Sequence, residues 1–244
     1  MRIARVATPD GPRTVRVADE GLIPIADPYA AFAAGVPVQD AGDPVRGSLL
    51  PPCVPTVVVG IAQNGPDHPS PVQAWLKSPR TIVGPDAEVR LRRDAGTTVA
   101  EAEVAVVIGR PTAGLTARNA HEFVLGITAV DDLSSPERAA SDPRNFESKS
   151  GAGYTPLGPV IDTALSIDDD LPLGLVVDGA DRALTSAGRL PMSLRECLAY
   201  VAGWSELGPG DVVMMGAPFS QAPVRPGQCV EVRVGDLRLR TLTV

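Results

Sequence analysis

Two glutamates, Glu101 and Glu103, stand at the start of the apolar segment 104–109 and are separated by one alanine. On a strand, alternate side chains share one face, so both carboxylates would project the same way from Cα atoms roughly 7 Å apart. That spacing lets the two side chains reach one hard cation. The next residues on that face, Ala105 and Val107, are apolar. Two unpaired carboxylates beside them would repel each other and resist desolvation unless a cation or a proton joined them. The alternative is a solvent-facing strand end with two ordinary surface acids.

Two further segments carry residues that could take part in chemistry. Asp131 and Asp132 follow the apolar segment 123–130, a position that suits a cleft, a turn or a helix cap. Lys149 lies in the glycine-rich segment 148–159, which we expect to be irregular. Loops of this kind often carry functional residues.

Several common catalytic motifs are absent from the sequence. It has no G-x-G-x-x-G after a strand, no phosphate loop G-x-x-x-x-G-K-[ST] and no G-x-S-x-G elbow. His68 and His121 are the only histidines, so any metal would be held mainly by carboxylates. The three cysteines are widely spaced, which argues against a disulfide framework and against a thiolate metal site.

The composition is that of a globular protein with an acidic balance. The 244 residues include 22 Lys and Arg against 29 Asp and Glu, a formal net charge of −7. Such a surface repels phosphate backbones, so nucleic acid is not an expected partner. No segment approaches the roughly 20 apolar residues that cross a bilayer, and residues 1–9 lack the apolar core of a secretory signal. We therefore expect no membrane association and a cytoplasmic location.

The elements that must position these residues are mostly strands. We expect a small β-rich module over residues 1–50, with a hairpin inside it, and a main domain over residues 51–244. Helices are expected over 28–35, from Thr116 through Ile127, and after a cap at Ser193. Strands are expected over 57–61, 100–108, 211–215, 229–234 and 237–244. Many strands and few helices indicate the α+β class.

From about residue 47 to the end, the order of segments resembles the fumarylacetoacetate hydrolase family. Residues 101–109 match that family's E-x-E-L-x-V-V-I-G closely, and residues 126–134 match G-Y-T-x-x-N-D-V-S. The other similar segments are N-Y-x-D-H at 64–68, F-x-K-P at 75–84, a lysine followed by P-x-G-P at 149–159, and L-x-P-G-D-x-I-x-T-G-T-P at 207–218. The resemblance implies layered mixed β-sheets with few helices, a small leading domain and a homodimer.

The resemblance also implies roles for individual residues. Glu101, Glu103 and Asp132 would bind a divalent cation, Mg²⁺ or Mn²⁺, and all-oxygen ligation is what hard cations prefer. Lys149 would lie beside the substrate and stabilise an enolate or oxyanion. His68, on a lid segment, would be the general base.

The substrate-binding positions depart from the family pattern. Where the family has a glutamate after the lid histidine, then an arginine, a glutamine and the threonine of G-T-P, this chain has Pro71, Pro136, Ala139 and Ala217. The metal half of the site therefore looks intact and the substrate half rebuilt. Lys77 and Arg138 are the candidate substrate-binding residues that remain.

These features predict a divalent-metal-dependent hydrolase of a C–C bond in a 1,3-dicarbonyl or 2-oxo acid, such as an acylpyruvate. Adjacent oxygens of this small-molecule substrate would chelate the cation, which draws electrons from the bond to be cleaved. One alternative is a decarboxylase or isomerase of a 2-oxo or 2-hydroxydienoic acid on the same metal site. Another is a repurposed biosynthetic-pathway protein that binds or cyclises a larger intermediate.

Overall fold

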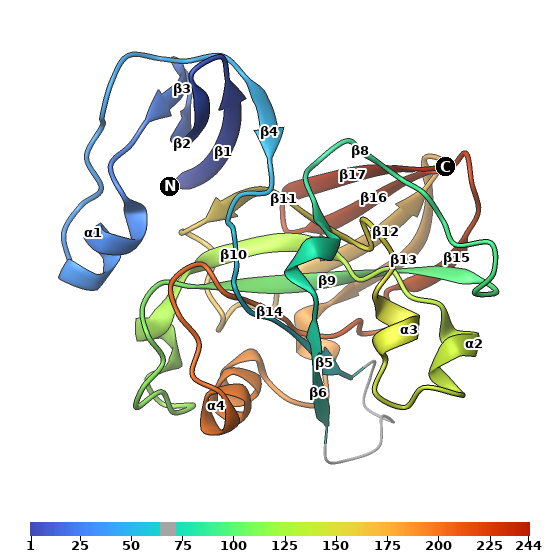
Figure 1. Ribbon diagram of the computed structural model, residues 1–244. Coiled ribbons are helices and arrows are strands. Elements are labelled where there is room, and N and C mark those ends of the chain that lie inside the picture. Colours follow the sequence, from blue (N-terminus) through green and yellow to red (C-terminus); the bar gives the residue numbers. More distant parts are fainter. Residues whose placement is uncertain (64–71) are drawn as a thin grey trace.

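Strands make up most of the structure and form two sheets (Figure 1). The computed structural model describes residues 1–63 and 72–244. The twelve-stranded sheet comprises β1 (Arg2–Thr8), β2 (Gly11–Ala18), β3 (Gly21–Pro24), β4 (Ser48–Leu50), β5 (Val58–Ala62), β6 (Gln73–Lys77), β7 (Ile82–Val83), β9 (Thr98–Ile108), β10 (Val124–Asp131), β11 (Thr155–Asp162), β14 (Val212–Met214) and β15 (Gln221–Val224). The five-stranded sheet comprises β8 (Ala87–Val89), β12 (Pro172–Val177), β13 (Ala180–Ser186), β16 (Cys229–Val234) and β17 (Leu237–Thr243).

The helices are few and short. They are α1 (Pro28–Ala34), α2 (Pro136–Ala139), α3 (Phe146–Lys149) and α4 (Leu194–Trp204), with 3-10 turns η1 (Pro79–Thr81), η2 (Ala120–Phe123) and η3 (Ala187–Arg189). None of these helices has the length and apolar character needed to cross a bilayer. The predicted architecture of mixed sheets with few helices is confirmed.

Strand β9 is the longest strand and holds the larger sheet together. It pairs with β10 along one edge, and with β14 and β15 at successive positions along the other. Figure 1 shows β9 and β10 as adjacent green strands that cross the middle of the molecule. Residues 105–107 of β9 therefore have cross-strand partners on both sides.

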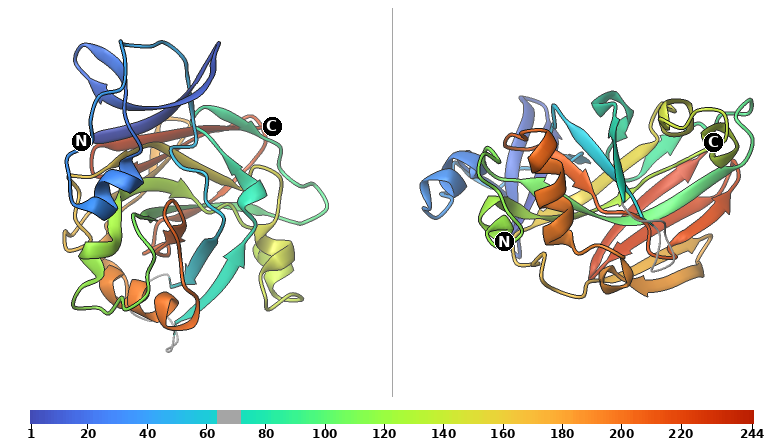
Figure 2. Two further views of the ribbon diagram at one scale, coloured as in Figure 1. Left: turned by 60° about the vertical axis from the view of Figure 1, so that its left-hand side comes forward. Right: turned by 90° about the horizontal axis from the view of Figure 1, so that it is seen from below.

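The two faces of β9 pack against different parts of the molecule. Val104 belongs to the large core between the sheets, together with Leu175 and Val232 of the smaller sheet. In Figure 2, right, the red and orange strands of the smaller sheet lie against the green β9. On the opposite face Ala105 and Val107 belong to a second apolar cluster. The strand is thus buried on both sides, which fixes the direction of every side chain along it.

Several local predictions from the sequence are confirmed. The N-terminal hairpin pairs β1 with β2, and α1 occupies the predicted range, with Asp27 as its N-cap and Gly35 in the left-handed C-terminal position. Helix α4 begins after Ser193, whose side chain forms a capping box with Glu196. Turn and capping residues were sufficient to predict the hairpin and these two helices.

The predicted helix from Thr116 through Ile127 is wrong. Only η2 is helical there, and the chain enters β10 at Val124. The apolar residues that gave the helical spacing belong in part to β10, a strand that is buried on both faces. Seven residues of β10 pair with β9. Pairing with a long central strand therefore overrides the local pattern.

The segment 148–159 is also more regular than predicted. Lys149 is the last residue of α3, and β11 begins at Thr155 and pairs with both β10 and β1. The irregular part is confined to residues between these two elements. Through the pairing of β1 with β11, the N-terminal strands extend the larger sheet. The division of the chain at residue 50 stays a prediction.

Candidate metal centre

Three carboxylates meet at the start of β9. Glu101 and Glu103 alternate on this strand, and Asp132 follows the last residue of β10. The Asp132 N–H donates to the Glu101 carbonyl oxygen over 2.9 Å, which sets the two residues side by side across the strands. One carboxylate oxygen from each of the three residues lies within 4.8 Å of the others. This is the arrangement that a single cation would need.

Two lysines offset part of the negative charge of this cluster. The Lys149 ammonium donates to Asp132 Oδ2 over 2.6 Å and to Glu101 Oε2 over 3.0 Å. The Lys77 ammonium donates to Asp132 Oδ1 and, over 2.6 Å, to the Tyr154 carbonyl oxygen. Both oxygens of Asp132 are therefore engaged by ammonium groups, in a part of the molecule that excludes solvent from the Asp132 side chain.

Burial and charge act against each other in these ion pairs. Burial favours a lower pKa for Lys149, but the carboxylates of Asp132, Glu101 and Glu103 more than offset it, so the net pKa is raised. For Lys77 burial dominates, and its pKa is lowered despite Asp132. Burial also works against the ionised form of Asp132, but Lys149 and Lys77 outweigh it and lower the pKa of that carboxyl. Asp132 is consequently the ionised carboxylate with which both lysines pair.

Glu103 is the most isolated of the three carboxylates. It is 1 % exposed, and its Oε2 accepts the Gly216 N–H over 2.8 Å. Burial first, and then the charges of Asp132 and Glu101, raise its pKa well above the ordinary value. A carboxyl in this position gains from any cation placed next to it, because a cation would remove the repulsion that raises its pKa.

Asp131 and Asp132 are adjacent in the sequence but have different partners. Asp131 is opposite Ala102 in the β10–β9 ladder, and its Oδ1 accepts the Glu101 N–H over 3.0 Å. Its second oxygen has no partner among the described residues. Burial, opposed by that backbone hydrogen bond, raises the pKa of Asp131 to about 7. Asp131 thus holds the backbone of Glu101, whereas Asp132 faces the cluster.

Three neighbours of the cluster were not identified from the sequence. Ser134 Oγ donates to Glu101 Oε1 over 2.6 Å and fixes that carboxylate from the side. The Lys149 ammonium lies 5.3 Å from the centroid of the Trp75 ring, a cation–π distance. The ring packs on Gly60, where a Cβ atom would come within 2.5 Å of it. Pairing of β5 with β6 places Gly60 opposite Trp75, and no local signal in the sequence shows that pairing.

The donor set suits a hard divalent cation. It offers carboxylate oxygens alone, and such sets select Mg²⁺, Mn²⁺ or Ca²⁺ over softer metals. Three carboxylates also exceed the charge of the two nearby ammonium groups. The cluster is therefore a candidate acidic metal site, and its residues fit such an ion.

The model of the family described as fumarylacetoacetate (FAA) hydrolase C-terminal matches residues 56–243. This chain belongs to the fumarylacetoacetate hydrolase family. The match covers both sheets from β5 onward and includes every residue of the acidic cluster.

Relatives that align with nearly the whole chain include a hydrolase and isomerases. The maleylpyruvate hydrolase of Aquipseudomonas alcaligenes is 26% identical over 99% of this chain and 81% of its own length. The crystal structure of 5-carboxymethyl-2-hydroxymuconate delta-isomerase from Mycobacterium smegmatis is 29% identical, with a TM-score of 0.91, over 100% of this chain and 99% of that one. The structure of 2-hydroxyhepta-2,4-diene-1,7-dioate isomerase from Mycobacterium marinum is 27% identical, with a TM-score of 0.89, over 100% and 98%. By these relatives, the chain is a family enzyme of the hydrolase or isomerase kind.

The other residues predicted for the site lie elsewhere or outside the described part of the chain. His68 falls in the segment 64–71, outside the described residues. Arg138 donates to the Asp94 carbonyl oxygen and lies 3.6 Å from the Glu147 carboxylate, so its described contacts are not with the acidic cluster. His121 is exposed.

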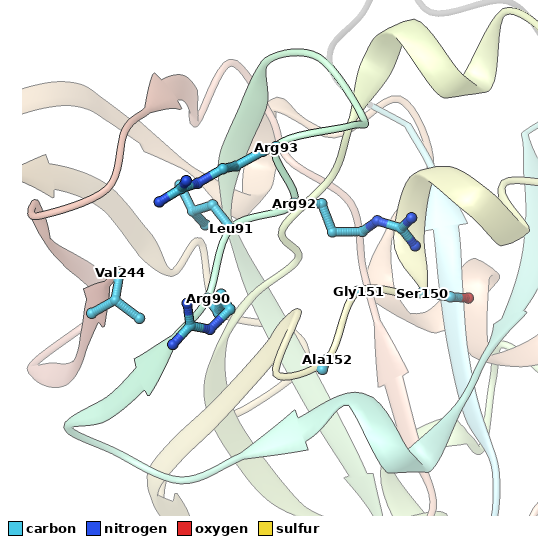
Figure 3. A pocket seen from close by; sticks show the side chains of 8 residues that line it. All are labelled: Arg90, Leu91, Arg92, Arg93, Ser150, Gly151, Ala152 and Val244. Atoms are coloured by element: carbon cyan, nitrogen blue, oxygen red, sulfur yellow. The ribbon is translucent and has the colours of Figure 1, made fainter.

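An arginine-lined pocket adjoins the loop after Lys149 (Figure 3). Its lining residues are Arg90, Leu91, Arg92, Arg93, Ser150, Gly151, Ala152 and Val244. None of the three carboxylates lines it, and Arg92 is already paired with Asp94. This pocket is therefore distinct from the candidate metal centre.

Proposed function

We propose that this protein is a divalent-metal-dependent hydrolase that cleaves a C–C bond in a 1,3-dicarbonyl or 2-oxo acid of the acylpyruvate type. The observation that carries the proposal is the cluster of buried Glu103 and Asp132 with partly exposed Glu101, against which two lysine ammonium groups lie. A site of this composition can bind a substrate rich in oxygen atoms and stabilise the negative charge that forms when an enolate leaves. The maleylpyruvate hydrolase similar over 99% of the chain supports this chemistry.

Glu101, Glu103 and Asp132 would hold the metal ion, Mg²⁺ or Mn²⁺. When bound, such an ion supplies Lewis-acid polarisation of substrate oxygens. Among the described residues, the Glu103 carboxylate accepts one backbone hydrogen bond and forms no ion pair with a lysine, so it can accept a cation. Ser134 and Asp131 keep Glu101 in place through its carboxylate and its backbone N–H.

Lys149 and Lys77 have different tasks in this proposal. Lys149 is 8 % exposed and reaches two of the three carboxylates, so its ammonium group can face a substrate bound over the cluster. It would stabilise the developing enolate by hydrogen bonding to its oxygen. Lys77 is fully shielded between Asp132 and the Tyr154 carbonyl, and it orients Asp132. Direct substrate contacts of Lys77 and of Arg138 stay predictions.

His68 would be the general base that activates water. Its place as the last residue of segment 64–68, which resembles the family's N-Y-x-D-H, supports this role. A His68→Gln variant would then lose hydrolysis while keeping metal affinity. Loss of both would show a role in holding the site together instead.

Calorimetric titration of the metal-free protein with Mg²⁺ and Mn²⁺ tests the metal site. We expect about one equivalent to bind, and Glu103→Gln to abolish binding, since coordination at the centre requires this buried carboxylate. Glu88→Gln is the matched control because Glu88 is an exposed glutamate of β8, in the smaller sheet, and does not belong to the cluster. Absence of binding in the wild-type protein, with and without oxalate, would overturn the metal-dependent function and favour a repurposed binding protein.

Product analysis of a 2,4-dioxo acid tests the reaction. Hydrolysis of the C–C bond would yield pyruvate and a second carboxylic acid in equal amounts. Release of CO₂ would instead identify a decarboxylase. The products identify the reaction type. The metal requirement is tested separately, by the metal titration of Glu103→Gln.

Isomerisation is the second candidate function. Two solved isomerases match the whole chain at TM-scores of 0.91 and 0.89. Moving a proton along a 2-hydroxydienoic acid uses the same charge-stabilising site but consumes no water. Conversion of such a dienoic acid to its oxo isomer, without any shorter carboxylic acid, would favour this candidate.

We also propose a homodimer in a reducing cytoplasm. The three cysteines are free in the structure, and Cys53 and Cys197 are buried, which is compatible with a reduced environment. Light scattering coupled to size-exclusion chromatography would test the dimer. A monomeric mass at micromolar concentration would contradict it.

A further inference from the structure

Strand β15 brings an additional polar side chain to the acidic cluster. In the antiparallel ladder between β15 and β9, Gln221 is opposite Glu101 and Ala222 is opposite Ala100. Paired residues of an antiparallel ladder point to the same face of the sheet. Ala222 is buried in the large core with Ala100, so the side chain of Gln221 lies on the other face, the face of Glu101.

Hydrogen bonding shows that Gln221 and Glu101 form the closer kind of cross-strand pair. The Ala102 N–H donates to the Ser220 carbonyl oxygen, and the Ser220 hydroxyl donates to the Ala102 carbonyl oxygen. The Glu101 N–H points the other way, to Asp131. Gln221 and Glu101 are therefore a non-hydrogen-bonded pair, in which Cα atoms are about 4.5 Å apart and side chains approach most closely.

A row of three residues results across the larger sheet. Asp132 flanks Glu101 on the β10 side, and Gln221 flanks it on the β15 side. Asp132 has no solvent-exposed side-chain surface, Glu101 keeps 13%, and Gln221 is exposed. The row thus leads from the closed side of the centre to its opening, and Gln221 stands at the opening.

The amide of Gln221 is available for a ligand. Within the described part of the chain, no hydrogen bond ties this side chain to the protein, whereas Glu101 is held by Lys149 and Ser134. An amide carries two N–H donors and one carbonyl acceptor. It can bind a keto or carboxylate oxygen without adding charge to a cluster that already contains two ammonium groups.

We infer that Gln221 is a specificity-determining residue, whose side-chain amide donates a hydrogen bond to an oxygen of the oxo acid bound at Glu101, Glu103 and Asp132. The inference rests on the proposed function. It assigns a substrate contact to β15. In this chain Pro136 and Ala139 replace the arginine and the glutamine that follow the metal-binding aspartate in the family pattern. Recognition by a neutral amide favours substrates through hydrogen-bond geometry rather than through an extra positive charge.

Oxalate titration of the Mn²⁺-loaded protein tests this contact, because oxalate is a small chelating diacid. We expect Gln221→Leu to weaken oxalate binding about tenfold or more, as the loss of a hydrogen bond to a charged group does, with Mn²⁺ affinity unchanged. Gln221→Glu should weaken oxalate further, because it places a carboxylate next to Glu101 and the dianion. The control is Gln39→Leu, which alters an exposed glutamine between α1 and β4.

The outcomes separate this inference from the proposed function. If the wild-type protein binds no Mn²⁺, both fail. If it binds Mn²⁺ and oxalate, and Gln221→Leu and Gln221→Glu bind oxalate as tightly as Gln39→Leu does, the contact is wrong and the metal-dependent function stands. Loss of Mn²⁺ binding in Gln221→Leu would mean that Gln221 maintains the cluster itself, which would also overturn the assigned role.

Discussion

The Lys77 ammonium and the Asp132 carboxylate form an ion pair in which neither side chain has any solvent-exposed surface. Two charges in such a place are stable only while each satisfies the other. Lys149 gives Asp132 a second cation, but the hydrogen-bond acceptors of Lys77 among the described residues are Asp132 and the Tyr154 carbonyl oxygen. Removing Asp132 therefore leaves a buried ammonium without its hydrogen-bonded carboxylate, whereas removing Lys77 leaves Asp132 with Lys149.

This asymmetry predicts unequal effects on stability. Asp132→Leu should lower the free energy of unfolding by about 3–5 kcal/mol, and Lys77→Met by less. Urea unfolding of both metal-free variants measures the difference. Arg92→Met, which breaks the exposed Arg92–Asp94 pair, is the control and should change stability little. A larger loss in Lys77→Met than in Asp132→Leu would contradict this account.

Lys149 is predicted to separate catalysis from metal binding. In the described structure its ammonium occupies oxygens of Asp132 and Glu101 that a metal would use. Lys149→Met removes that competitor, so Mn²⁺ affinity should hold or rise. Turnover should fall at least about 100-fold, because charge stabilisation in the transition state is lost.

Calorimetry with Mn²⁺ and steady-state kinetics on a 2,4-dioxo acid measure the two effects of Lys149→Met. Lys149→Arg keeps the charge and should retain metal binding, with partial activity. A Lys149→Met variant with weaker metal binding and unchanged turnover would exclude the assigned role.

Part of the site was predictable because strands have a period of two. Alternation alone put Glu101 and Glu103 on one face, and the structure shows them there. The place of Asp132 depends on the register between β10 and β9, and the segment that contains β10 showed a misleading helical spacing. Position after the apolar segment 123–130 marked Asp131 and Asp132 as candidates, and only the resemblance to the family assigned Asp132 to the metal.

Contacts made through distant pairings could not be predicted in this way. The pairing of β6 with β5 places Trp75 near Lys149, and the pairing of β15 with β9 places Gln221 opposite Glu101. The β15–β9 pairing joins segments that are far apart in the sequence, and residues 64–71, between β5 and β6, lie outside the described residues. Long-range register is set by the assembled core and not by local propensity.

Asp211 is predicted to be structural, although it lies in one of the segments that resemble the family. It is 2 % exposed, and its carboxylate accepts hydrogen bonds from Thr56 N–H, the Thr56 hydroxyl, Val57 N–H and Gly208 N–H. These bonds join the chain before β5 to the turn before β14, the two parallel neighbours. Asp211→Ala would leave several partly buried donors without their acceptor and should cost about 2–3 kcal/mol.

Thermal or urea unfolding measures the effect of Asp211→Ala, and metal titration shows whether the centre is altered. We expect a large loss of stability with the Mn²⁺ affinity of the remaining folded protein retained. Loss of metal binding at full stability would instead place Asp211 in the site.

Cys53 and Cys197 are predicted to be inert thiols in the folded protein. Burial raises the pKa of both to about 12, although the Gln63 side chain, which donates to Cys197 Sγ over 3.1 Å, acts in the opposite direction. Because only the thiolate reacts, the reactive fraction at pH 8 is on the order of one in ten thousand, and it rises with pH. Iodoacetamide labelling followed by mass spectrometry should modify neither residue at pH 8 until urea unfolds the chain. Rapid labelling of Cys197 in the folded protein would show that helix α4 opens on the time scale of the reaction, and that the packing between Gln63 and Cys197 is weaker than its burial indicates.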